Sequence, residues 1–154
     1  MENIQPNSFK AWMLAARPKT LTGAAIPVMT GCSLAAMYGH FKIVPAVLCF
    51  LFAFLMQIDA NFVNDLYDFL KGSDREDRLG PERACSQGWI SQKNMMYGII
   101  ITTILAGISG LSLLFFCGWE IIPVGIACIV FAFLYTAGPY PLAYHGFGDI
   151  LVLL

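Results

Sequence analysis

The sequence predicts an all-α membrane protein, a polytopic bundle of transmembrane helices. Of its 154 residues, 58% are hydrophobic and 12% are charged, and the mean hydropathy is +0.68. Few soluble domains are so apolar. Apolar runs near the about 20 residues that cross a hydrocarbon core recur along the chain. Cationic residues gather in the segments on one side of these runs, as they do in proteins that cross a membrane several times.

Four apolar runs are complete predicted spans: residues 20–37, 43–69, 95–117 and 119–135. The first follows cationic residues and could be mistaken for a signal peptide, but the later spans favour an uncleaved helix. A fifth run starts at Gly146, and the nine residues to Leu154 cannot cross a bilayer. We therefore expect residues 1–154 to be the N-terminal part of a single membrane domain.

The distribution of lysine and arginine predicts the orientation of the spans. Eight of the nine fall before the first span or between the second and third: Lys10, Arg17, Lys19, Lys71, Arg75, Arg78, Arg83 and Lys93. Only Lys42 lies on the other side. By the positive-inside rule, the amino terminus and the loop 71–93 face the cytoplasm, in a multi-pass protein of the inner (cytoplasmic) membrane.

The second span carries the most informative polar residues. At about 100° per residue, one helical face of about 100° holds five side chains with oxygen atoms: Gln57, Asn61, Asn64, Asp65 and Asp68. Such an oxygen-rich wall suits a hard divalent cation, which can carry a diphosphate with it. Asp59 lies on nearly the opposite face, so we expect it to contact a neighbouring helix and not a metal.

The loop 71–93 mixes cations with carboxylates. Guanidinium groups such as Arg78 and Arg83 beside carboxylates suit a metal diphosphate, with oxygen ligands for the metal and cations for the outer phosphate oxygens. A solvated loop that only fixes topology is the alternative interpretation. The sequence shows no helix-turn-helix, aromatic-basic ladder or glycine-rich phosphate loop, so we expect no nucleic-acid partner.

These residues resemble a known family. Asn64-Asp65-x-x-Asp68 at a cytoplasmic helix end resembles the first aspartate-rich motif of the membrane aromatic prenyltransferases of the UbiA type. The family places another aspartate four residues after Asp68, where this chain has Gly72, and the next carboxylate is Asp74. Residues 71–74, 77–84 and 88–91 resemble the branch that prenylates 1,4-dihydroxy-2-naphthoate.

The resemblance implies a bundle of about nine helices around a central cavity, with a second aspartate-rich motif that has no counterpart in these residues. It implies Mg²⁺ on Asp65, Asp68 and Asp74, with Asp65, Asp68 and Arg83 as catalytic residues. The residues implied to bind substrate are Asn61, Asn64, Lys71, Arg78 and Tyr135, although a tyrosine at a span end is also a common interfacial anchor. The implied reaction joins a polyprenyl diphosphate to the naphthoate with loss of CO2.

Other interpretations stay open from the sequence. Members of the same family use other acceptors, such as 4-hydroxybenzoate or haem. A cation transporter with an acidic intramembrane site is a non-enzymatic alternative, although it predicts acidic residues on broken helices near mid-bilayer. We expect these 154 residues alone to be inactive, either as an incomplete sequence or as one half of a site completed by a separately encoded C-terminal half.

Overall fold

The computed structural model describes residues 4–72 and 82–136, and all regular secondary structure in these ranges is helical. Predictions for Asp74, Arg78 and the start of a fifth span lie outside the described residues. The elements are α1 (Phe9–Ala16), the 3₁₀ helix η1 (Pro18–Thr20), α2 (Leu21–Met37), α3 (Ile43–Leu70), α4 (Gln92–Ser112), the 3₁₀ helix η2 (Leu113–Phe115) and α5 (Ile121–Thr136).

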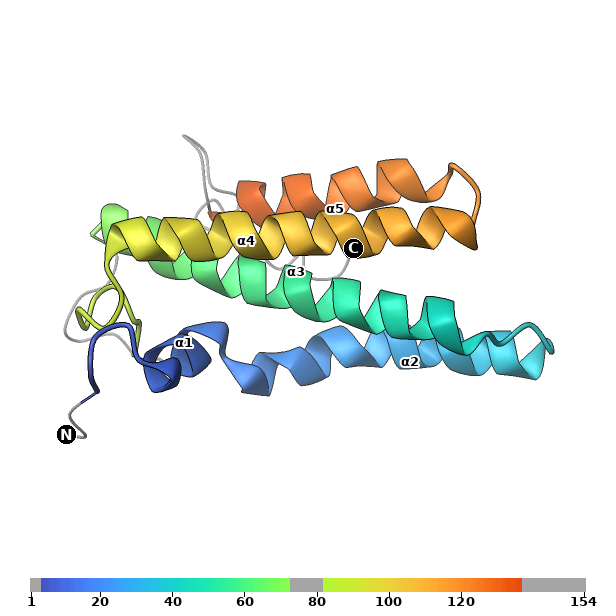
Figure 1. Ribbon diagram of the computed structural model, residues 1–154, viewed down its shortest axis with the longest axis horizontal. Coiled ribbons are helices and arrows are strands. Elements are labelled where there is room, and N and C mark those ends of the chain that lie inside the picture. Colours follow the sequence, from blue (N-terminus) through green and yellow to red (C-terminus); the bar gives the residue numbers. More distant parts are fainter. Residues whose placement is uncertain (1–3, 73–81, 137–154) are drawn as a thin grey trace.

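The long helices α2 to α5 run up and down alongside one another, and α3 is the central one (Figure 1). It packs against α1, α2, α4 and α5. The turns between α2 and α3 and between α4 and α5 lie at one end of the bundle. The opposite end, which we call the polar end, holds α1, the last turns of α3 and the loop 82–91 (Figure 1).

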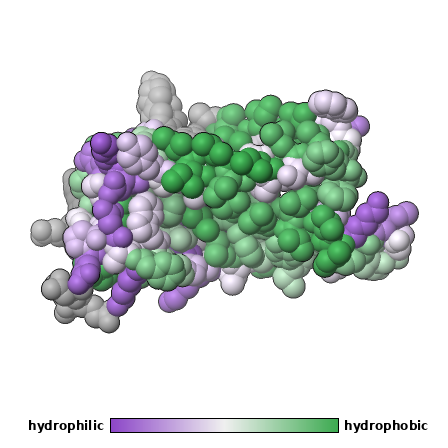
Figure 2. Space-filling model, in the orientation of Figure 1, coloured by the Kyte–Doolittle hydropathy of each residue, from purple (hydrophilic) through white to green (hydrophobic). Residues whose placement is uncertain are grey.

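Three helical segments have the length and composition to cross a membrane: Phe9–Met37, Ile43–Leu70 and Gln92–Phe115. The fourth predicted span corresponds to α5, whose apolar part Ile121–Phe131 is shorter. Exposed apolar side chains such as Ile26, Val47 and Ile104 contribute to a hydrophobic middle zone, with hydrophilic residues at both ends of the molecule (Figure 2). The described residues therefore confirm an apolar helical chain and three helices of spanning length.

Local sequence sets where the helices begin and end. Ser8 and Ser91 cap α1 and α4, and their hydroxyl oxygens accept hydrogen bonds from the backbone N–H groups of Ala11 and Asn94. After α1, Arg17 adopts a left-handed conformation with φ of 50°, and Pro18 starts a new helical turn. The α1 helix was not among the helices predicted from the sequence.

The tightest packing lies at the polar end. Ala11 of α1, Leu66 of α3 and Met95 of α4 belong to one buried cluster, together with Ala84 and Ile90 of the loop. Trp12 packs edge-on against Phe62, with ring centroids 5.4 Å apart. Gly98 of α4 faces this pair, and a Cβ atom at its position would lie 2.7 Å from the Trp12 ring. The bundle end can close this tightly only because position 98 has no side chain.

Gly98→Ala should therefore destabilise the protein by about 1–3 kcal/mol, because the added methyl displaces Trp12 from Phe62. The melting temperature of the purified protein, followed by tryptophan fluorescence, measures the change. Gly107→Ala is the matched control, because a Cβ atom there would meet nothing within 4 Å. Its melting temperature should stay the same or rise, since alanine is the better helix former. Equal losses in both variants would contradict the packing argument.

Candidate functional site

The carboxylate of Asp65 joins α3 to the loop that follows it. Asp65 is 1% exposed, and its Oδ2 and Oδ1 atoms accept hydrogen bonds from the backbone N–H groups of Ala84 and Cys85, each at 2.9 Å. The loop itself is a compact set of turns, in which the N–H of Trp89 donates to the carbonyl of Ala84. Asp65 thus holds the loop against the polar end of α3.

This docking brings Arg83 to the same helix end. The buried guanidinium of Arg83 forms an ion pair with the carboxylate of Asp68 and donates a hydrogen bond to the backbone carbonyl of Asn64. The three predicted catalytic residues, Asp65, Asp68 and Arg83, therefore lie together in the structure. A buried cation beside a carboxylate also lowers the cost of burying either group.

Two amides of the predicted oxygen-rich wall are engaged with the N-terminal segment. Asn61 donates from Nδ2 to the carbonyl of Ala16 and to the hydroxyl of Thr20, both at 2.9 Å. Gln57 donates to the same hydroxyl at 3.4 Å. Asn61, predicted to bind substrate, thus connects α3 to the junction between α1 and α2. Ala16 and Thr20 belong to this region, although neither was among the predicted site residues. The helix break at Pro18, which lies between them, is the feature of the sequence that could have indicated their role.

The other predicted residues are placed less completely. Asn64 is half-buried beside Asp65, and Lys71 is exposed directly after α3. Tyr135 belongs to α5, but its side chain is not among the described ones, and Asp74 and Arg78 lie outside the described residues. Asp59 contacts Thr102 and Thr103 of α4, which confirms the predicted contact with a neighbouring helix.

Two carboxylates at the polar end are the candidate metal ligands among the described residues. In residues 4–72 and 82–136, no group of three histidine, cysteine, aspartate or glutamate side chains could hold a metal ion. Asp65 and Asp68 supply two carboxylates, and each carboxylate oxygen has a second lone pair beyond those used by the N–H groups. Mg²⁺ commonly binds through one or two carboxylates together with substrate phosphates. Within the described residues, Asp65 and Asp68 are the carboxylates that could take part in such a site, and in the structure Asp65 accepts from backbone N–H groups while Asp68 pairs with Arg83.

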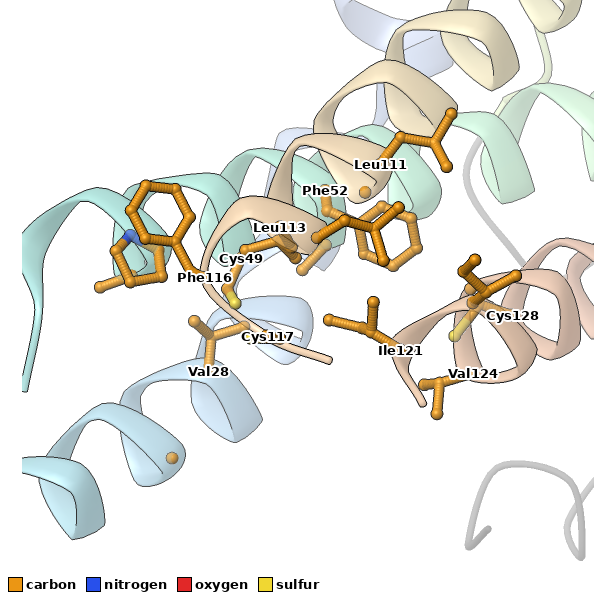
Figure 3. A pocket seen from close by; sticks show the side chains of 18 of the residues that line it. Val28, Cys49, Phe52, Leu111, Leu113, Phe116, Cys117, Ile121, Val124 and Cys128 are labelled. Atoms are coloured by element: carbon orange, nitrogen blue, oxygen red, sulfur yellow. The ribbon is translucent and has the colours of Figure 1, made fainter. Parts of the chain in front are cut away.

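A second feature of the chain is an apolar cavity of about 980 Å³ between α2, α3, α4 and α5 (Figure 3). Its walls include Val28, Phe52, Leu111 and Ile121, one from each of these helices. Phe52 precedes Asp65 by 13 residues on α3, so the cavity lies about 20 Å along the helix from the carboxylates. Along α3 the structure thus has a charged region at the polar end and an apolar cavity further along the helix.

Comparisons with a protein family and with individual proteins point to the same family. Residues 24–154 match the UbiA prenyltransferase family. The chain is 40% identical, over all of its length, to 52% of a 1,4-dihydroxy-2-naphthoate octaprenyltransferase of Escherichia coli (strain K12). Proteins of the same name from Haemophilus influenzae and Mycobacterium tuberculosis are 40% and 33% identical over 94% and 96% of the chain, and half of each relative is covered. The chain spans about half the length of these relatives, and no solved structure matches it significantly.

The Asp65 contacts predict that a substitution of Asp65 loosens the loop 82–91 even when no ligand is bound. Asp65→Asn turns one acceptor into a donor that faces a backbone N–H, which should cost about 1–3 kcal/mol. Hydrogen exchange of the loop 82–91 in ligand-free protein should speed up, whereas Glu82→Gln, a change at an exposed residue of the same loop, should not alter it. Unchanged exchange in Asp65→Asn would mean that this carboxylate does not hold the loop.

Proposed function

Because the chain belongs to the UbiA prenyltransferase family, we propose that it forms part of an enzyme that transfers a polyprenyl group from an allylic diphosphate to 1,4-dihydroxy-2-naphthoate. The product would be demethylmenaquinone, formed with loss of CO2. The names of the relatives support this acceptor. The observation that carries the proposal is that Asp65, Asp68 and Arg83 lie together at the polar end of α3.

In this proposal the polar end binds the diphosphate. The Arg83 guanidinium, which pairs with Asp68, would donate hydrogen bonds to the phosphate oxygens. Asp65 and Asp68, with Asp74, would hold Mg²⁺, and Lys71 and Arg78 would add positive charge. Magnesium, when bound, supplies neutralisation of the charge that develops on the departing diphosphate.

Bond changes in the proposed reaction follow from the two substrates. The allylic carbon–oxygen bond breaks, and its electron pair leaves with the diphosphate. The electron-rich ring carbon attacks the allylic carbon, and the bond from that ring carbon to its carboxylate breaks, which releases CO2 and restores aromaticity. An allylic cation must be kept from water. Leu66, which follows Asp65 on α3, and Ile90 of the loop are buried and would help to exclude it.

The apolar cavity suits the polyprenyl tail. Its walls are mostly hydrocarbon, and it begins where the polar residues of α3 end. A polyprenyl chain has no group that can hydrogen-bond, so its burial is favoured in proportion to the apolar area removed from water. A substrate with a charged head and a long oily tail would therefore use both regions of α3.

We also propose that the polar end faces the cytoplasm. The α1 helix with Lys10, the end of α3 before Lys71, and the loop 82–91 with Arg83, followed by Lys93 on α4, lie at that end of the bundle (Figure 1). Lys42 belongs to the turn between α2 and α3 at the other end. This arrangement is the one that the positive-inside rule favours. In this orientation the carboxylates would face the compartment that holds magnesium and activated diphosphates.

In the complete protein, Asp65→Asn and Asp68→Asn should each lower prenyl transfer by about 100- to 1,000-fold or more, because each removes a proposed ligand of the Mg²⁺ that neutralises the departing diphosphate. Transfer from labelled polyprenyl diphosphate to a panel of aromatic acceptors measures the loss and identifies the acceptor. Asp59→Asn is the control, because Asp59 faces α4, and its activity should change much less. Full activity in Asp68→Asn would remove the metal assignment.

Single cysteines introduced for labelling should report the orientation. A cysteine at exposed Glu82 should react with an impermeant reagent only from the cytoplasmic side, and one at exposed Lys42 only from the opposite side. The native cysteines are replaced beforehand so that they add no background. The reverse pattern would separate the carboxylates from their proposed substrate and would overturn the prenyltransferase assignment.

A further inference from the structure

Asp59 is a buried carboxyl group that the proposed reaction does not use. It is 0% exposed in the interface between α3 and α4. Its Oδ1 atom contacts the hydroxyl groups of Thr102 and Thr103, the latter at 3.1 Å. Its Oδ2 atom is buried and has no hydrogen-bond partner within the described part of the chain. One oxygen of the Asp59 carboxyl group is therefore hydrogen-bonded and the other is not.

The helices that pack against α3 bring no cation to this position. Neither α2 nor α5 contains a charged or histidine residue, and α4 contains only Lys93, about 13 Å along the helix from Thr102. The α1 helix contributes Lys10, whose side chain is exposed, and Arg17 follows α1 at the polar end. On α3 itself the other ionisable side chains are Cys49, Asp65, Tyr67 and Asp68, and none of them is a cation. An isolated charged carboxylate in an apolar interface costs far more free energy than two hydroxyl contacts return.

The positions of the hydroxyl groups allow a neutral arrangement. The Oγ1 atom of Thr102 lies 2.9 Å from the carbonyl oxygen of Gly98 and also contacts Asp59. A hydroxyl group has one hydrogen but two lone pairs, so Thr102 can donate to Gly98 while it accepts from Asp59. Thr103 can then donate to Asp59. In this arrangement the Oδ2 atom without a partner is a carbonyl oxygen, which is cheaper to bury than an anionic one.

We propose that Asp59 is a neutral carboxylic acid that donates to Thr102 and accepts from Thr103, and that it acts as a positioning residue which fixes the register of α3 against α4. Apolar contacts alone define that register weakly in a membrane, because lipid competes equally well for apolar surface. A directional pair of hydrogen bonds allows one rotation and one axial position of the two helices.

This register matters for the polar end. Asp65 follows Asp59 by six residues, about 9 Å along α3, and α4 begins directly after the loop 82–91 that Asp65 holds. Asp59 therefore connects α3 directly to α4, and Asp65, about two turns further along α3, connects α3 to the loop that leads into α4. We call this closed arrangement of α3, loop and α4 the frame. If α4 shifted along α3 at Asp59, the loop would shift with it, and the N–H groups of Ala84 and Cys85 would move away from the Asp65 carboxylate.

Infrared spectroscopy of the purified protein in lipid tests the protonation. Asp59→Asn should remove a carboxylic-acid carbonyl band that is present in the wild type, whereas Asp65→Asn should leave this band in place. Thr102→Val, which removes the acceptor, should shift the band. Thr30→Val is the matched control, because its hydroxyl donates only to a carbonyl within α2. A wild-type spectrum without the band, or a band that survives in Asp59→Asn, would overturn the proposal.

Hydrogen exchange of the Ala84 and Cys85 amides tests the positioning role. Asp59→Leu should speed their exchange by about tenfold or more, because the frame opens locally. Asp59→Asn should restore protection to within about threefold of the wild type, since its NH2 group can donate one hydrogen bond to each of the two hydroxyl oxygens. If Asp59→Leu does not fold, Thr103→Val, a change of nearly equal shape, should show the same direction. Wild-type protection in these apolar variants would overturn the positioning role. Neither readout depends on transferase activity, so failure of the proposed reaction would be seen separately.

Discussion

The two hydrogen bonds from the Ala84 and Cys85 N–H groups to the Asp65 carboxylate are the contacts on which the polar end depends. They cross 19 and 20 residues of sequence and turn a polar loop back onto the helix that precedes it. Hydrogen bonds to a carboxylate are stronger than those between neutral groups, and these are buried. Because the loop is held there, the Arg83 guanidinium reaches Asp68 and the backbone of Asn64. The fold of the loop is thus as necessary as the sequence of α3 for bringing Asp65, Asp68 and Arg83 together.

The α3 helix is fixed to its neighbours by polar contacts at three levels. Asp65 holds the loop, Asn61 holds the junction of α1 and α2, and Asp59 contacts α4. Between these levels the packing is apolar, and apolar surfaces in a bilayer can slide or rotate because lipid replaces them at little cost. Directional contacts at intervals along one helix therefore define how the surrounding helices are arranged. The same polar residues that suggest chemistry also determine the architecture.

Sequence periodicity and charge were sufficient to predict the apolar helices, the helical face of the oxygen-rich wall and the opposite direction of Asp59. They were not sufficient for α1, which has only eight residues and is defined by the Ser8 cap and the turn at Arg17. Periodicity gives the face on which a side chain lies but not its partner. Asn61 therefore appeared to be a ligand residue, and its contact with Ala16, 45 residues away, could not be foreseen.

The pairing of Asp59 with Thr102 has a consequence for biosynthesis. The two residues are 43 positions apart, so α3 leaves the ribosome several seconds before its partner on α4 at about 5–20 residues per second. During that interval an acidic side chain in the middle of a helix faces lipid or the insertion machinery, at a cost of about 2.5–3.5 kcal/mol. Insertion of α3 and α4 together, as a helical hairpin, avoids this cost. The membrane assembly of the chain would then proceed by helix pairs and not by single helices.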